Sequence, residues 1–135
     1  VQLEVGSVAT DFEHRSFAQE LALCQRYTYM VKGNDRDYTG YSGYSTSTTA
    51  ALFPILFPVA MRAQPSFTLN GGARFQGASN DSATFTSGIA ISNPNTNFTA
   101  VALYVTGTSG LGAADRPGNL QFIGDDSSLL FSAEL

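Results

Sequence analysis

Three tyrosines recur at every third position of a segment rich in Gly, Ser and Thr, and their chemistry suits ligand binding. Tyr38, Tyr41 and Tyr44 fall within KGNDRDYTGYSGYSTS, residues 32–47. A tyrosine ring offers an apolar face for stacking and a hydroxyl for hydrogen bonding. Tyrosines among Gly and Ser are also typical of recognition loops. Tyr38, Tyr41 and Tyr44 are therefore the best ligand candidates in the chain, as part of a glycan-binding loop. The alternative is that the rings pack against a sheet or a neighbouring chain.

The surroundings of the single histidine and the single cysteine disfavour catalysis. His14 stands between Glu13 and Arg15, and Cys24 falls on a predicted apolar helical stripe. A catalytic histidine needs a nucleophile and an orienting acid close by, and the chain has no Gly-x-Ser-x-Gly motif. We therefore expect a structural polar cluster at His14, a small core residue at Cys24, and no enzymatic activity.

Two acidic segments, Asn34-Asp35-Arg36-Asp37 and Asp125-Asp126, carry oxygen ligands that calcium accepts. Neither has the glycine and the distal glutamate of an EF-hand loop. We interpret both as solvated turns, with a calcium site in an assembly as the alternative. One cysteine also excludes a multi-cysteine zinc site. The sequence thus predicts no cofactor and no resident metal.

Composition limits the class of protein. The chain has 135 residues, of which 43% are hydrophobic and only 13% charged, and its net charge is −4. This length suits one domain, residues 1–135. Without a basic cluster, binding to nucleic acid is not expected. No apolar run reaches the length of about 20 residues that crosses a bilayer, so membrane insertion is not expected either.

A short helix must position the histidine and the cysteine. Ser16 and Gln19 form a Ser-x-x-Gln capping box, which predicts a helix over residues 17–25. Phe17, Leu21 and Cys24 then share one stripe, which we expect to face inward. Residues 1–5 and 26–31 have the alternation or the β-branched and aromatic content of strands. Because residues 1–5 read as a strand from the start, we expect the chain to be a fragment of a longer protein.

The rest of the chain predicts short strands separated by turns. Phe53, Ile55, Phe57 and further apolar residues alternate up to residue 61, with Pro54 and Pro58 on the other face, which predicts an edge strand or a strand whose partner is irregular. Further predicted strands are 66–69, 83–91 with a bulge at Gly88, 98–106, 120–123 and 129–135; residues 70–72 and 107–118 are predicted turns or loops. This pattern is typical of an all-β, antiparallel β-sandwich or jelly-roll-like head with one short N-terminal helix. Residues 1–31 would form its base and 32–135 the sandwich.

The first 30 residues also resemble a segment near the C-terminus of tail-fibre and other virion appendage proteins of tailed bacteriophages, those of marine and cyanobacterial phages in particular. The shared pattern includes Phe-Glu-x-Arg and Glu-Leu-x-x-Cys-Gln-Arg-Tyr, and it departs at Asp11 and Thr28. The residues of this chain that match the two motifs are Phe12, Glu13, Arg15, Glu20, Leu21, Cys24, Gln25, Arg26 and Tyr27.

The resemblance implies a homotrimeric, β-rich head at the tip of a virion fibre, assembled in the host cytoplasm, that binds a host cell-surface glycan or protein receptor. It also implies that the Cys-Gln-Arg-Tyr motif organises the base of the head. The motif fits equally well a structural trimerisation or capping module with no receptor role. A third hypothesis, a glycan-degrading tailspike, requires a pair of carboxylates that the sequence does not place together.

Overall fold

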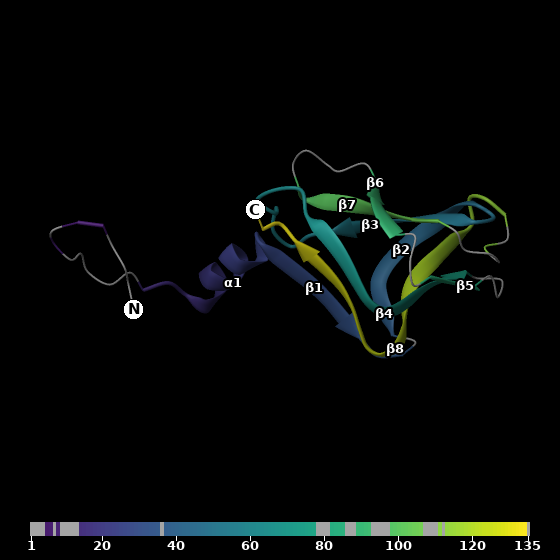
Figure 1. Cartoon of the computed structure of the whole chain (residues 1–135), viewed down its shortest axis with the longest axis horizontal. Coiled ribbons are helices and arrows are strands. Elements are labelled where there is room, and N and C mark those ends of the chain that lie inside the picture. Colours follow the sequence, from purple (N-terminus) through teal and green to yellow (C-terminus); the bar gives the residue numbers. More distant parts are fainter. Residues whose placement is uncertain are drawn as a thin grey trace.

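The computed structural model describes residues 5, 6, 8, 14–35, 37–77, 82–85, 89–92, 98–106, 111 and 113–134. These residues form α1 (Phe17–Gln25), β1 (Thr28–Gly33), β2 (Tyr38–Ser47), β3 (Ala50–Leu56), β4 (Ser66–Gly77), β5 (Ser82–Phe85), β6 (Ile89–Ser92), β7 (Ala100–Thr106) and β8 (Pro117–Ser132). The helix projects from one end of the strands (Figure 1). Within this described part of the chain, no helix is long and apolar enough to cross a membrane.

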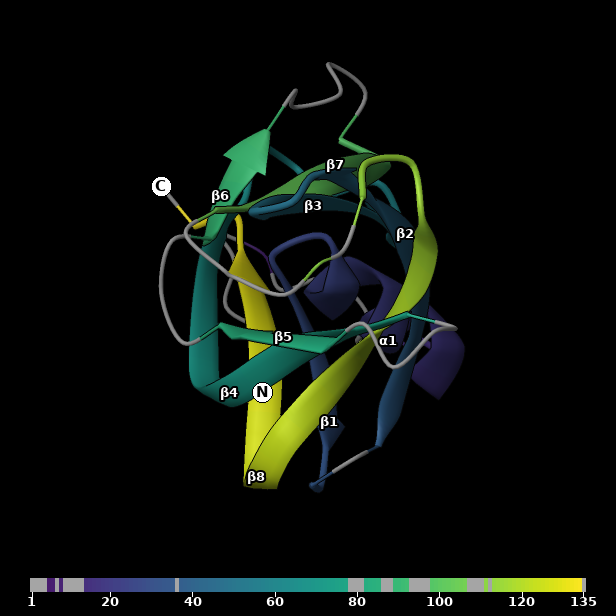
Figure 2. The ribbon, with the colours of Figure 1, turned by 90° about the vertical axis from the view of Figure 1, so that its right-hand side faces the viewer.

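The strands form one antiparallel sheet that curls into a nearly closed barrel. Seven of the described strands follow the order β5-β4-β8-β2-β3-β7-β6, and β1 pairs with β8 beside this path. Figure 2 shows the strands surrounding a common interior. The predictions of an all-β antiparallel fold and of one short helix are confirmed. The strands are continuous in a single sheet, however, and do not form the two stacked sheets of the predicted sandwich.

The strand β8 is long enough to pair with three others. Along one edge it pairs with β4 over most of its length; along the other it pairs with β2 through Pro117–Gln121 and with β1 through Ser127–Ser132. The predicted turn at residues 70–72 is wrong, because β4 continues through it with a bulge. Gly71 has a φ of 77°, and a Cβ there would overlap the hydroxyl of Ser127. Only glycine fits this crossing of β4 and β8.

The strand β3 is an interior strand, so the predicted edge is wrong; the alternative prediction, an irregular partner, agrees with the register shift of β2 between Ser45 and Ser47. The strand β3 lies between β2 and β7. Pro54 pairs with Ala102 of β7, whereas the pairing with β2 ends at Leu52. One side of Pro54 therefore has no ladder partner, and proline is tolerated because its missing N–H is not needed there.

Two further predictions of extent are wrong. The tyrosine-rich segment forms β2 and not a loop, because it pairs with both β3 and β8. The predicted strand 83–91 is divided into β5 and β6, which lie at opposite ends of the strand order. The predicted strand 1–5 and the bulge at Gly88 lie outside the described residues, except for Val5. By contrast, β7 agrees with the predicted strand 98–106 within two residues.

Aromatic side chains fill the barrel. Phe53 contacts Phe75 and Phe85 at ring-centroid distances of 5.9 and 6.3 Å. A second group centres on Phe131, which lies 5.2 Å from Phe57 and 5.3 Å from Phe67. The predicted alternation of apolar residues is confirmed in part: Phe53, Ile55, Phe57 and Met61 are buried and Val59 is partly buried, but the strand itself ends at Leu56.

A row of glycines makes room for two of these rings. Gly43 of β2, Gly118 of β8 and Gly77 of β4 lie side by side in the sheet. A Cβ on Gly118 would overlap the ring of Phe75, and one on Gly43 would overlap the ring of Phe53. Both phenylalanines are fully buried. The two rings therefore lie directly beneath the backbone of this row.

We expect Gly118→Ala to lower the free energy of unfolding by about 1–3 kcal/mol, because the added methyl group overpacks a ring that cannot move away. Denaturant unfolding would measure the loss. Gly6→Ala is the matched control: its Cβ would meet only the carbonyl of Val8, at 3.8 Å, so we expect a change within about 0.5 kcal/mol. If Gly118→Ala and Gly6→Ala had the same free energy of unfolding, the space that Gly118 leaves for the Phe75 ring would not contribute to stability.

Candidate functional site

The three tyrosines predicted as a ligand surface lie on both faces of β2. Tyr38 and Tyr44 are exposed on the outer face, with 61% and 43% of their surface accessible, whereas Tyr41 packs against the core. The cause is the strand itself, because side chains three positions apart in an extended strand point to opposite faces. Only Tyr38 and Tyr44 are therefore available to a ligand outside the barrel.

Tyr41 has a structural role. Its hydroxyl lies 3.1 Å from that of Tyr29, and the Tyr29 ring contacts Phe57 at 5.7 Å. Burial raises the pKa of Tyr41 well above its ordinary value, and the hydrogen bond with Tyr29 raises it further. For this residue the alternative interpretation, packing against the sheet, is the correct one.

The outer face of β5, β4, β8 and β2 carries polar side chains in two rows, which we call the polar face. The pairing aligns one row as Ser82, Gln76, Asn119 and Ser42, and the next as Thr84, Arg74, Gln121 and Tyr38. Within the rows, the Ser42 hydroxyl donates to the Asn119 side-chain carbonyl at 2.7 Å. This hydrogen bond fixes the Ser42 and Asn119 side chains relative to one another across the paired strands β2 and β8.

A shallow hollow of about 420 Å³ opens on this face. Tyr38, Ser42, Gln76, Gly77, Pro117, Gly118 and Asn119 line it. Amide and hydroxyl groups both donate and accept hydrogen bonds. Beside them stands the exposed ring of Tyr38. This combination suits a neutral or weakly charged ligand with many hydroxyl groups.

Sequence reasoning found Tyr38 but missed its neighbours. The signal was present, because polar and apolar residues alternate in Arg74-Phe75-Gln76 and in Asn119-Leu120-Gln121. Such alternation predicts strands with one polar face. It does not say which strands are neighbours, so the two rows could be assembled only from the pairing.

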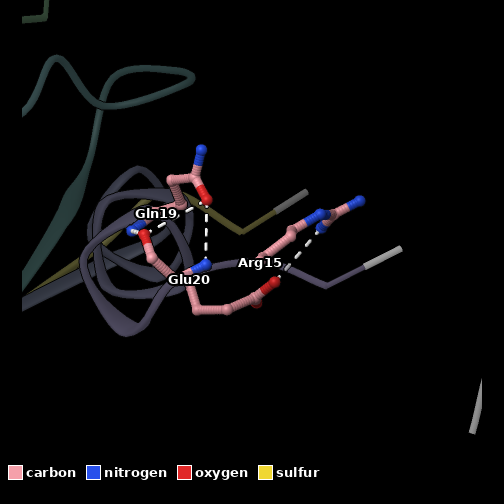
Figure 3. A network of polar contacts seen from close by, with 4 residues as sticks. Arg15, Gln19 and Glu20 are labelled. Atoms are coloured by element: carbon pink, nitrogen blue, oxygen red, sulfur yellow. Dashed lines mark hydrogen bonds and ion pairs between the residues drawn. The ribbon is translucent and has the colours of Figure 1, made fainter. Parts of the chain in front are cut away.

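The N-terminal motif begins with the predicted capping box. The Gln19 amide N–H donates to the Ser16 hydroxyl at 3.3 Å, and the Ser16 amide N–H donates to the Gln19 side chain at 2.9 Å. Figure 3 shows both contacts, together with the Arg15–Glu20 ion pair of 3.4 Å. Helix α1 therefore starts where the sequence predicts. Glu13 lies outside the described residues.

The predicted inward stripe of α1 is wrong. Phe17 and Leu21 expose 83% and 44% of their surfaces, Cys24 is exposed, and no residue of α1 is buried. The opposite side of the helix lines a hollow with Val59 of the barrel; its residues are Gln19, Ala22, Leu23 and Arg26. At 3.6 residues per turn, the stripe of Phe17, Leu21 and Cys24 therefore faces away from the chain's own barrel.

The Cys-Gln-Arg-Tyr motif joins this helix to the barrel. The carbonyl of Arg26 accepts from the Arg62 amide at 2.8 Å, and that of Tyr27 accepts from the Ala133 amide at 2.7 Å. The guanidinium of Arg62 also lies 5.0 Å from the centroid of the Tyr27 ring. At this end of the barrel the motif contributes backbone carbonyls and one ring, while Gln25 is partly buried.

The other candidate residues are dispersed. His14 lines the hollow beneath α1. Asp35 accepts from the Gly124 amide at 3.0 Å, Asp37 from the Asn34 amide at 2.8 Å, and Asp126 pairs with Lys32 at 2.9 Å. Among the described residues, no group of three or more His, Cys, Asp or Glu side chains comes together as a metal site would require. Asp35 and Asp37 lie in the connection between β1 and β2, whereas Asp125 and Asp126 lie within β8, so the predicted turn at Asp125-Asp126 is part of a strand; Arg36 lies outside the described residues.

The raised pKa of Tyr41 predicts a stability that falls at high pH. Above a pH of about 10 the unfolded tyrosine loses its proton while the folded one keeps it, so the free energy of unfolding decreases as the pH rises; because Tyr41 is partly exposed and screened by solvent, the decrease is smaller than the full value of about 1.4 kcal/mol per pH unit for a buried group. Tyr41→Phe removes this contribution, and at neutral pH it costs about 0.5–1.5 kcal/mol through the lost hydrogen bond. Denaturant unfolding between pH 8 and about 11 measures both effects. If the free energy of unfolding of Tyr41→Phe fell with pH as steeply as that of the wild type, Tyr41 would not be the source of the pH dependence.

Comparison of the chain with protein-family models, with curated proteins and with solved structures finds no match. A function must therefore be inferred from the chain's own side chains, together with the resemblance of its N-terminal motif.

Proposed function

We propose that this chain is the receptor-binding head of a virion appendage of the tailed-phage type, and that it attaches to host cells by binding a surface glycan at the polar face. The observation that carries the proposal is the shallow hollow in which the exposed ring of Tyr38 stands beside Ser42, Gln76 and Asn119. An aromatic face next to amide and hydroxyl groups matches the apolar face and the hydroxyl rim of a sugar ring. The N-terminal motif supports the assignment to a virion.

The shallowness of the hollow agrees with attachment through several weak sites. A homotrimer would present three polar faces, and linked sites raise avidity by about 10²–10⁴ over a single one. Strong binding therefore does not require a deep pocket. This reasoning supports a host cell-surface glycan over a small free metabolite as the ligand.

Binding without catalysis is the simplest activity for this site. Glycoside hydrolysis uses a pair of carboxylates on either side of the scissile bond. The residues that line the hollow carry hydroxyl, amide and phenol groups, and no carboxylate belongs to that set. We therefore propose a non-enzymatic head rather than a glycan-degrading tailspike.

We expect Tyr38→Ala and Asn119→Ala each to weaken glycan binding about threefold to tenfold, because a stacked ring or a pair of hydrogen bonds contributes about 1 kcal/mol. A glycan array would identify the ligand, and titration would measure the affinity. Tyr104→Ala is the matched control, since Tyr104 is a partly buried tyrosine on β7, outside the polar face.

Two results would contradict this proposal. One is the absence of binding to any glycan on the array and to host cells. The other is equal loss of binding in the Tyr104 and Tyr38 variants, which would place the site elsewhere.

A second candidate function, a structural trimerisation or capping module, is favoured by the outward stripe of α1. A contiguous apolar surface without cover marks an interaction site. The single charged residue of α1, Glu20, is paired with Arg15. Phe17 alone exposes 83% of a side chain that can bury about 150–250 Å². We propose a second copy of this chain as the occupant, so that the stripes of sister helices cover one another.

We expect Leu21→Glu to shift the protein from oligomer to monomer in sedimentation velocity, because a charge would have to be buried between helices. The matched control is Leu56→Glu, which changes a leucine of β3 that is 67% exposed and leaves the oligomer intact. In the separated monomer, Leu21→Ala should cost under about 1 kcal/mol, since the side chain is not buried there.

A wild-type chain that is monomeric at micromolar concentration would exclude self-association through α1. An oligomer that binds neither glycan nor host cell would favour the structural module over the receptor-binding head.

A further inference from the structure

Arg74 is the single charged side chain of the polar face as the structure describes it. The other members of the two rows are Ser82, Gln76, Asn119, Ser42, Thr84, Gln121 and Tyr38, all uncharged. The chain as a whole has a net charge of −4. A lone cation on this face is therefore a local feature and does not reflect a generally basic surface.

The guanidinium of Arg74 is held in place from one side. Its Nε donates to the Gln121 side-chain carbonyl at 2.6 Å, and Gln121 is only 4% exposed. A guanidinium has five N–H donors, and the terminal pair forms a fork that matches a planar carboxylate. The bond to Gln121 uses Nε and leaves that fork available. The arginine is thus oriented before a ligand arrives.

No carboxylate among the described residues pairs with this fork. Three of the described acids are engaged elsewhere: Glu20 pairs with Arg15, Asp126 pairs with Lys32, and Asp37 accepts from the Asn34 amide. An arginine oriented by a buried amide and without an internal carboxylate is a suitable receptor for an external one.

The row that contains Arg74 also contains the exposed ring of Tyr38. Gln121 of β8 lies between them, paired with Arg74 on one side and with Tyr38 on the other. Two strand spacings separate β4 from β2, which is about 10 Å. This separation suits a ligand of two linked sugar rings better than a single ring.

We propose that the ligand is an acidic saccharide, whose carboxylate binds the fork of Arg74 while an adjacent ring stacks on Tyr38. The proposal rests on the glycan-binding function above and specifies its ligand class. The amide and hydroxyl groups of the neighbouring row then contact the sugar hydroxyls, and Arg74 selects for charge.

The test compares three probes of the same length: oligogalacturonate, its methyl ester, and a sulfated neutral oligosaccharide. Titration calorimetry with the intact chain would measure each affinity at low and moderate salt. We expect oligogalacturonate to bind at least about tenfold tighter than its methyl ester, a preference that weakens as salt rises. Arg74→Gln should reduce the preference to less than about twofold, and Arg74→Lys should retain part of it.

Lys32→Gln is the matched control, because it removes the same charge from an exposed ion pair and should leave the preference unchanged. Thermal melts confirm that each variant is folded. Equal binding of the acid and its methyl ester overturns the inference but leaves glycan binding intact. A preference for the sulfated probe over the carboxylate also overturns it. Binding of no probe counts against both the inference and the proposed function.

Discussion

The backbone of β8 is the element on which the rest of the structure depends. A strand of sixteen residues has hydrogen-bonding groups along two edges, and here β4 takes one edge while β2 and β1 share the other. Buried backbone groups must be paired, so the change of partner requires a break in the ladder. The break lies at Gly124–Ser127, where the Ser127 hydroxyl donates to the Ile123 carbonyl at 2.6 Å. Beyond this corner, β8 pairs with β1 on one edge and with β4 on the other.

The same arrangement creates the polar face. Because β8 lies between β4 and β2, its outward residues Asn119 and Gln121 each have a partner on both sides. The inward residues of the same stretch, Leu120 and Phe122, are buried in the core. The register of β8 with β4 and β2 therefore sets both the packing of the core and the spacing of the candidate ligand groups. A change of register would alter both together.

Structure that depends on residues close in the sequence, such as a helix start, was predictable. Which strands pair with one another was not. The capping box of Ser16 and Gln19 defines α1 through contacts within four residues, so the helix was predicted with its correct bounds. The surroundings of α1 could not be predicted in the same way. An apolar stripe indicates that a helix face packs against something, but it does not say whether the packing surface belongs to the same chain or to another. Gly71 read as a turn, since the sequence does not show that Ser127 crosses beside it.

The tyrosines show the same limit. A segment rich in Gly, Ser and Thr has low intrinsic preference for any regular structure, so β2 forms because two neighbouring strands pair with it. In a strand, successive side chains point to opposite faces, so Tyr41 and Tyr38 lie on different faces of β2. The three-residue spacing would have allowed them to share a surface only in a loop. The candidate site was thus half predictable: the aromatic group could be named, while the amides beside it depended on β4 and β8.

All members of the polar face lie on hydrogen-bonded strands and none on a connecting segment. Groups anchored in this way lose little conformational entropy when a partner docks. Their separations also come in fixed multiples of the strand spacing. If the polar face binds the proposed ligand, its specificity changes through exchange of one side chain at a time and does not depend on the lengths of the connecting segments.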